Sequence, residues 1–257
     1  MMVQENGVPV GMKDYPVSAE VRMEAARELA RLDRQRGADL LTRFAAKDAN
    51  IAAHVPVQAA RALAGVAGYQ DLAASLLESL AVDVDLRVYV RMDAAWDLAE
   101  VDGGHERGAD LLARLARDTT QEADVRAEAA RILVRVEGCR DRGADLLVRL
   151  ADDATLYAHV RLQAARILSE MAPYKGVGAD RLIAFADDTT HETHIRIDAA
   201  HDLADADGYK DRGAELLEQA RTTSCICRPG KPKGSDAASD APGAPDGCGC
   251  GCGCDQG

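Results

Sequence analysis

The residues best suited to chemistry are six cysteines near the C-terminal end of the 257-residue chain. They form two clusters in which one residue separates each cysteine from the next. The clusters comprise Cys225, Cys227, Cys248, Cys250, Cys252 and Cys254. Thiolates grouped in this way suit soft or borderline ions such as Zn(II) and Cu(I). The tail is therefore a candidate metal site, and Zn(II) or Cu(I) is the only cofactor that the sequence suggests.

A Pro/Gly/Ser-rich segment, residues 228–247, separates the two clusters and lacks large apolar side chains. This composition is typical of a disordered linker, which would let both clusters share one ion. Two other interpretations of the tail stay open. In one, another enzyme modifies the Cys-Gly run, and the folded part of the chain is its carrier. In the other, the tail is a redox-sensitive or low-complexity extension without a specific function.

Three histidines, His191, His194 and His201, are spaced so that their imidazoles could lie near one helix face, as a metal site requires. His194, however, occupies the same repeat position as His54 and His159. Packing between repeats explains such a recurring position without a metal ion. The charged residues also recur in this way, and no serine-hydrolase, zinc-protease or P-loop motif is present. The sequence therefore predicts a protein that is not an enzyme.

Two aromatic residues, Tyr89 and Trp96, stand in one repeat of a chain with only 4% aromatic residues. Trp96 replaces an Arg or His of the other repeats. Because aromatic side chains often anchor partner proteins, these two are candidate partner-binding residues. The filling of a local packing gap is the competing explanation for Trp96. Cys139 takes a turn position that holds tyrosine in other repeats, and we interpret it as an incidental thiol.

The elements that position these residues are six copies of a repeat of 34 or 35 residues. Each copy has an apolar residue eight positions before a leucine, with two adjacent alanines between them. The apolar residues are Val21, Val55, Val90, Val125, Val160 and Ile195. This spacing places them on one face of a helix, and the block that follows, GADLLVRLA in the fourth copy, has the same period. Each repeat is thus predicted to be a first helix, a short turn and a second helix.

The turns carry suitable residues. Asp-Thr-Thr at 118–120 and 188–190 is expected to cap the following helix, and Pro56 fits a first helical turn. Glycines mark the ends of four first helices. These glycines are Gly68, Gly103, Gly138 and Gly208.

The block V-R-x-x-A-A-x-x-L resembles the HEAT-like repeats of bacterial proteins over roughly residues 18–221. The resemblance implies an all-α, right-handed α-solenoid of six helical hairpins, with a concave surface lined by second helices. It also implies a ladder between repeats, in which an Asp pairs with the Arg of the block. Here the aspartate series, which includes Asp118 and Asp153, precedes that Arg by eight residues, a longer spacing than in the usual pattern.

The predicted organisation is an irregular lead at 1–17, the solenoid at 18–221 and a disordered tail at 222–257. A net charge of −12 opposes nucleic-acid and anionic membrane partners, and it fits a basic protein partner. No apolar run is long enough to span a membrane, and the first residues do not read as a secretory signal. We therefore expect a cytoplasmic protein.

The resemblance implies a non-enzymatic binding or scaffold protein that engages a protein or peptide partner on its concave surface. One alternative is a metal-handling protein whose thiolate tail captures the ion. Another is a precursor or carrier whose Cys-Gly tail is modified after translation.

Overall fold

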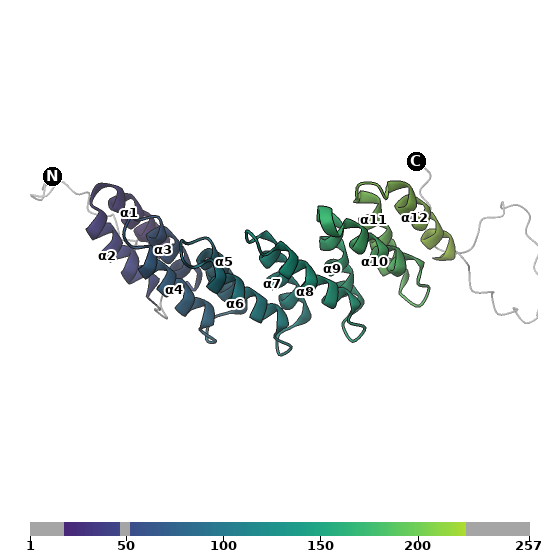
Figure 1. The fold of residues 1–257 in the computed structure, drawn as a ribbon, viewed down its shortest axis with the longest axis horizontal. Coiled ribbons are helices and arrows are strands. Elements are labelled where there is room, and N and C mark those ends of the chain that lie inside the picture. Colours follow the sequence, from purple (N-terminus) through teal and green to yellow (C-terminus); the bar gives the residue numbers. More distant parts are fainter. Residues whose placement is uncertain (1–17, 47–51, 225–257) are drawn as a thin grey trace, which may run out of the picture. The chain divides into compact units, whose positions relative to one another are not determined.

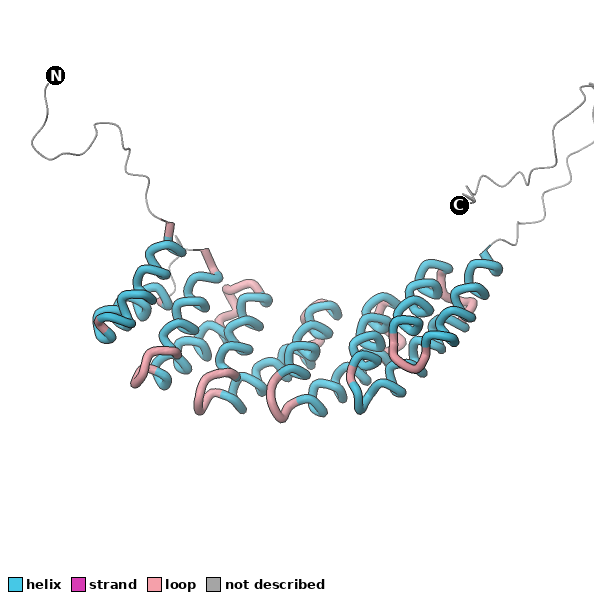
Figure 2. The backbone as a smooth tube through the Cα atoms, turned by 90° about the horizontal axis from the view of Figure 1, so that it is seen from above, coloured by secondary structure: helices cyan, strands magenta, loops and turns pink. Residues whose placement is uncertain are grey.

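A computed structural model of the chain describes residues 18–46 and 52–224. Within these ranges the chain forms twelve α-helices and one 3₁₀ helix, and no strand (Figures 1 and 2). The helices are α1 (Ala19–Leu32), α2 (Arg34–Ala45), α3 (His54–Ala64), α4 (Gln70–Val82), α5 (Val88–Ala99), α6 (His105–Arg117), α7 (Ala123–Arg135), α8 (Arg140–Asp152), α9 (Ala158–Glu170), η1 (Ala172–Tyr174), α10 (Lys175–Asp187), α11 (Thr193–Asp205) and α12 (Lys210–Ser224). The all-helical prediction is confirmed for this part of the chain.

The chain divides into two compact units, and the division falls after Leu168, within α9. In the first unit each helix from α1 to α8 packs against the next one. The first helices α1, α3, α5 and α7 also contact one another in order, as do the second helices α4, α6 and α8. They form two layers (Figure 1). In the second unit α11 packs between α10 and α12, which also contact each other.

Alanine and leucine fill the space between the layers, as the repeat pattern predicts. In α7, Ala129, Ala130 and Leu133 are completely buried. A buried leucine side chain stabilises the fold by about 1.5–3 kcal/mol relative to an exposed one. The alanine pair adds little volume, so that neighbouring helices can approach closely.

A glycine near the start of the second helix sets the closest approach within a helix pair. A Cβ atom placed on Gly143 of α8 would lie 2.7 Å from the backbone nitrogen of Val134 on α7. On Gly213 of α12 it would lie 2.4 Å from the backbone nitrogen of Ala204 on α11. The second repeat has Ala73 at this position. The sequence analysis did not identify this steric requirement.

The turns after four first helices contain glycine with a positive φ, between 69° and 86°, as predicted. The first turn is different, because Asp33 alone separates α1 from α2 and caps α2 by accepting a hydrogen bond from the Arg36 amide at 3.2 Å. Eight positions separate Leu29 from Gly37, whereas ten separate the equivalent residues of every other repeat. As a result, Leu32 is 89% exposed, although its counterpart Val66 is 8% exposed.

The predicted capping role of the Asp-Thr-Thr segments is wrong. The Asp118 carboxylate accepts hydrogen bonds from the Thr120 amide, at 3.0 Å, and from the Thr120 hydroxyl, at 2.6 Å. The following helix α7 starts after Glu122, with no side-chain cap. Asp188 and Thr190 repeat this arrangement. These residues close the turn itself, because the Thr donors lie two residues away and are reached before the helix begins.

In the third to sixth repeats, the arginine of the repeat block joins the repeat to the one before it. The second repeat has Pro56 at this position. The Nε atom of Arg161 donates to the Ala151 carbonyl in the last turn of α8, at 3.2 Å. Arg196 donates in the same way to the Ala186 carbonyl of α10, at 3.0 Å. Arg91 and Arg126 make equivalent bonds. The arginine thus satisfies a helix-end carbonyl, and the positive charge also suits the negative end of the helix dipole.

The resemblance pairs the aspartate series with the repeat arginines in a ladder, and one aspartate of this series, Asp153, interacts with two of these arginines through their charges. The Thr155 hydroxyl and amide lower the pKa of Asp153 most, and the charges of Arg126 and Arg161 lower it further. The aspartate therefore lies in the field of arginines from its own repeat and from the next one.

The first described helix begins at Ala19 and the last one ends at Ser224. The Ser18 side chain caps α1 by accepting from the Val21 amide, and Pro56 is the third residue of α3. At the other end α12 continues to Ser224, so that residues 222–224 are helical rather than part of the linker. Among the described residues, no helix combines the length and apolarity needed to cross a membrane.

Candidate partner-binding grooves

Two cavities of the first unit lie between neighbouring first helices, near the C-terminal ends of those helices. The first groove, between α1 and α3, has a volume of about 670 Å³. The second groove, between α3 and α5, has a volume of about 470 Å³. Arg27 and Val66 line the first groove at the repeat positions that Arg61 and Val101 hold in the second. The two grooves are thus equivalent sites in consecutive repeats.

The second groove contains the buried charge of this unit. Asp97, on α5, is only 4% exposed. One of its carboxylate oxygens, Oδ1, accepts a hydrogen bond from Arg61 Nη2 at 2.7 Å. The other, Oδ2, is buried and has no hydrogen-bond partner among the described residues. A buried polar atom without a partner costs about 1–3 kcal/mol, and more when it is charged, which makes this oxygen a strong potential acceptor.

The environment of Asp97 opposes its ionisation. Burial raises the pKa of the carboxyl from 3.8 to about 6, against the hydrogen bond and the charge of Arg61, which lower it. The negative charges of Asp93, on the same helix, and of Glu100, directly after it, raise the pKa further. Arg61 does not fully offset the effect of burial on this pKa, because its side chain is 59% exposed and water screens its charge.

Trp96 also lines the second groove and is half-buried. The guanidinium carbon of Arg135, on α7, lies 5.2 Å from the centre of the indole ring, a cation–π contact. Because α3 and α7 pack on opposite sides of α5, Arg135 approaches Trp96 from the side away from the groove. The aromatic candidate of the sequence analysis therefore combines packing with access to a cavity.

Tyr89, the other aromatic candidate, is 55% exposed at the start of α5. A separation of seven residues places it on the same side of the helix as Trp96, two turns away. It is not among the residues that line the two grooves. The structure thus puts both aromatics on one helix face, but only Trp96 at a cavity.

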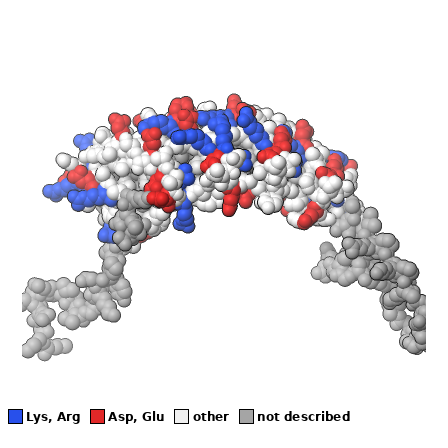
Figure 3. Space-filling view, turned by 90° about the horizontal axis from the view of Figure 1, so that it is seen from below, with Lys and Arg blue, Asp and Glu red and all other residues white. Residues whose placement is uncertain are grey.

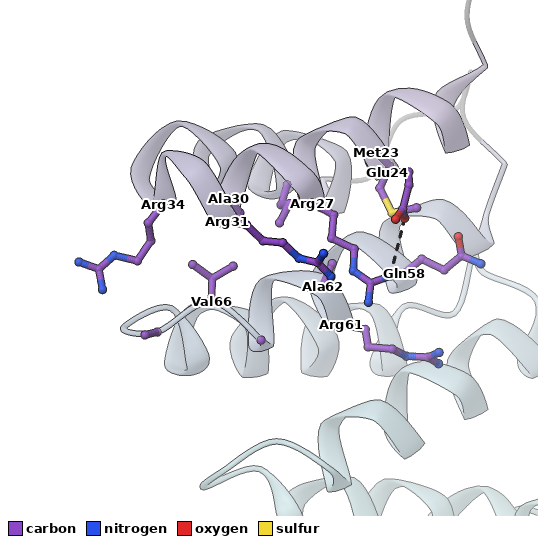
Figure 4. A pocket seen from close by; sticks show the side chains of 13 residues that line it. Met23, Glu24, Arg27, Ala30, Arg31, Arg34, Gln58, Arg61, Ala62 and Val66 are labelled. Atoms are coloured by element: carbon purple, nitrogen blue, oxygen red, sulfur yellow. Dashed lines mark ion pairs between the residues drawn. The ribbon is translucent and has the colours of Figure 1, made fainter.

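The first groove has the opposite charge. Its lining includes four arginines and a single acidic residue, Glu24. The arginines are Arg27, Arg31, Arg34 and Arg61. Figure 4 shows the side chains of Arg27 and Arg31 extending from α1 toward Ala62 on α3.

Glu24 only partly offsets this positive charge. It lies 3.7 Å from Arg27, beyond normal hydrogen-bond length, and both side chains are more than half exposed. Arg31 pairs with Glu28 at 3.2 Å, on the surface of α1. No ion pair or hydrogen bond joins the Arg34 guanidinium to another described residue, and this side chain points away from α3 in Figure 4.

The separation of charge between the grooves is local. Over the face shown in Figure 3, Lys and Arg side chains are interspersed with Asp and Glu. In the second groove the acidic residues are Asp97, Glu100 and Asp102, and Arg61 is the only basic one. The first groove, one repeat earlier, is dominated by arginine. Arg61 lines both grooves and forms the boundary between them.

The shortened first turn accompanies the larger volume of the first groove. Leu32 points into solvent, whereas its counterparts are buried, Val66 in the lining of the first groove and Val101 in that of the second. The chain passes directly from α1 into α2, and Arg31 and Arg34 line the space at this end. The sequence signal for this difference is the missing pair of residues between Leu29 and Gly37.

The candidate metal ligands fall in two groups. The six tail cysteines, Cys225, Cys227, Cys248, Cys250, Cys252 and Cys254, lie outside the described residues. Of the three candidate histidines, His194 has Nδ1 3.2 Å from Glu192, and His201 is exposed. His54 and His159 share the repeat position of His194, and each has Nε2 3.6 Å from an acid of the preceding repeat, Glu20 and Asp124. His191 stacks on Phe185. Within the part of the chain that the structure describes, no group of three or more metal-ligating side chains could hold an ion.

Cys139 is buried, with 7% of its surface exposed. Burial raises the pKa of its thiol, and the nearby Glu106 charge adds to this effect. A protonated, buried thiol is a poor nucleophile and a poor metal ligand. This environment agrees with the interpretation of Cys139 as incidental.

Comparison of the chain with protein families, with curated proteins and with solved structures finds no match.

The sequence analysis missed Asp97 and Arg61. The residue type at the position of Asp97 varies among the other repeats: it is apolar at Ala62, Ile132 and Ile167, and acidic at Glu28 and Asp202. The carboxylate is therefore no signal by itself, and only its place beside the single tryptophan distinguishes Asp97. The pairing with Arg61 could not be read from the spacing, because it joins two helices.

Proposed function

We propose that the chain is a non-enzymatic, HEAT-like repeat protein of six helical hairpins that binds a protein or peptide partner. The observation that carries the proposal is the second groove. There, a half-buried tryptophan and a buried carboxylate with one partnerless oxygen line a cavity of about 470 Å³. Such a cavity can hold one side chain of a partner.

The chemistry of the groove favours a basic side chain. A lysine or arginine of the partner would give Asp97 Oδ2 the hydrogen-bond donor that it lacks. Its positive charge would also offset the part of the Asp97 charge that Arg61 leaves uncompensated. The indole of Trp96 beside it suits a cation or its aliphatic stem. The net charge of −12 would favour approach of a basic partner.

The other charged residues support a binding role rather than catalysis. The repeat arginines bond to helix-end carbonyls, and the aspartates of the 118/153/188 series close turns. Their recurrence in consecutive repeats is explained by these structural roles. The concave surface of second helices, which the sequence favoured as the binding face, stays a prediction, since the proposed anchor lies on first helices.

The test is selection of peptides from a random display library on the immobilised full chain. Enriched peptides are then titrated while the fluorescence of Trp96, the only tryptophan, is followed. We expect enrichment of Lys or Arg, a fluorescence change on binding, and at least tenfold weaker binding to the Asp97→Asn variant. Asp145→Asn, an exposed carboxylate on α8, is the matched control and should bind normally. Equal binding to Asp97→Asn and Asp145→Asn would refute the proposed site.

A further inference from the structure

The two grooves are adjacent, equivalent in the repeat and opposite in charge, and this arrangement suggests what they recognise together. We propose that they bind one extended peptide segment of a partner, with an acidic residue in the first groove and a basic residue three positions away in the second. This inference rests on the proposed function and adds the charge pattern of the partner.

The first groove is suited to a carboxylate. Arg27 and Arg31 both extend from α1 across the groove, and their acidic neighbours, Glu24 and Glu28, lie on the same helix. These intrahelical pairs are exposed and contribute little to stability, so that an incoming carboxylate can compete for the guanidinium groups. Arginine binds a carboxylate through two parallel hydrogen bonds, which fixes its orientation.

The second groove is suited to a cation because Asp97 Oδ2 has no partner and the carboxylate is 4% exposed. Arg61 is held between the grooves by its 2.7 Å contact with Asp97 Oδ1. It therefore presents positive charge to the first groove, while the second oxygen of Asp97 stays without a partner among the described residues. Reversal of the peptide's two charges would place like charges together in both grooves.

The spacing follows from the repeat. One first helix, α3, separates the two grooves, and the axes of packed helices are about 8–10 Å apart. An extended peptide advances about 3.3 Å per residue. Three residues thus cover the distance from one groove to the next, whereas adjacent charges would both fall into one groove.

The test uses the full chain and fluorescein-labelled twelve-residue peptides in a Gly/Ala frame, measured by fluorescence anisotropy at low salt. The probe carries one Asp and one Arg three positions apart, in either order along the chain. Comparison peptides carry the same two residues side by side, or Lys in place of Asp. We expect the best-ordered probe to bind at least tenfold more tightly than both comparison peptides.

Variants assign each charge to its groove. Arg27→Glu combined with Arg31→Glu changes two exposed side chains and should reverse the preference, so that the peptide with Lys in place of Asp binds better. Arg149→Glu, an exposed arginine on α8, is the control and should leave the preference unchanged. Circular dichroism melting of each variant confirms that the helices are intact.

The outcomes separate this inference from the proposed function. If all peptides with an Arg bind equally, and Asp97→Asn abolishes this binding, the second groove functions alone and the paired recognition is refuted. If no peptide binds, both proposals fail. A synthetic peptide of residues 228–240 places Lys233 and Asp236 three positions apart. If it binds more tightly than every designed probe, the occupant is the chain's own tail and a separate partner is refuted.

Discussion

Replacement of Asp97 by asparagine should stabilise the chain at neutral pH, although it removes an ion pair. The pKa of the carboxyl rises from 3.8 to about 6 because burial opposes its charge. At 1.36 kcal/mol per pKa unit, ionisation of this carboxyl costs about 3 kcal/mol more in the folded chain than in the unfolded chain. Asparagine has the same shape and stays neutral, so that Asp97→Asn should gain a large part of this free energy above pH 6.

The sign of the pH dependence provides the internal control. Since the folded-state pKa of Asp97 is raised, the folded chain binds the proton more tightly than the unfolded chain does. Its contribution to stability is present below pH 3.8 and is lost as the pH rises through about 6. The gain from Asp97→Asn should therefore be largest at pH 8 and should vanish near pH 4.

The assay is urea unfolding of both proteins at pH 4, 5, 6, 7 and 8, followed by circular dichroism at 222 nm. Free energies of unfolding come from the linear dependence on urea concentration. Asp145→Asn, which changes an exposed carboxylate, should shift stability by less than about 0.5 kcal/mol at every pH. If Asp97→Asn is less stable than the wild type at pH 8, the Arg61 pair outweighs burial, and the account of a strained carboxylate is wrong.

Three further predictions concern the helix contacts and the groove. Gly143→Ala should destabilise the chain by about 1–3 kcal/mol in thermal unfolding, because the new Cβ would meet the α7 backbone. The control Gly176→Ala should leave stability unchanged, because its Cβ would lie 3.8 Å from the nearest such atom, a tyrosine hydroxyl. Arg196→Met should lower the free energy of unfolding in urea by about 1.5–3 kcal/mol, because it removes a buried charged donor from a helix-end carbonyl. Arg149→Met, which changes an exposed side chain, should lower it much less. Binding of a selected basic peptide should weaken as the pH falls below about 6, because Asp97 becomes protonated, and fluorescence titrations at pH 5 and pH 7.5 that agree would contradict this.

Much of the fold could be predicted because the repeat makes each element visible several times. The spacing of Ala129, Ala130 and Leu133 recurs in every repeat, and these residues are buried as the pattern requires. The glycines of four turns have the positive φ that a helix end favours. Local signals of this kind depend on the chain's own backbone and need no knowledge of neighbouring helices.

The features that the sequence analysis missed or misread depend on competition or on neighbours. The Asp118 carboxylate can cap a helix or close a turn, and the hydrogen bond from the nearby Thr120 hydroxyl stabilises the turn. Gly143 looks like an ordinary helix residue until the distance to α7 is known. Asp97 is buried by its contacts with other helices, and its partner Arg61 is one repeat away. Interactions between layers cannot be derived from the period of a single helix.

The bonds from four repeat arginines to the helix ends before them all run in the same direction along the chain. The last carbonyls of α4, α6, α8 and α10 thus each receive a hydrogen bond from the repeat that follows. A chain shortened from its N-terminal side would keep all of these closures for the helices that remain. A chain shortened from its C-terminal side would expose the last carbonyls of a new terminal helix, which would fray first. Loss of repeats, by proteolysis or by pulling, should therefore be easier from the C-terminal end.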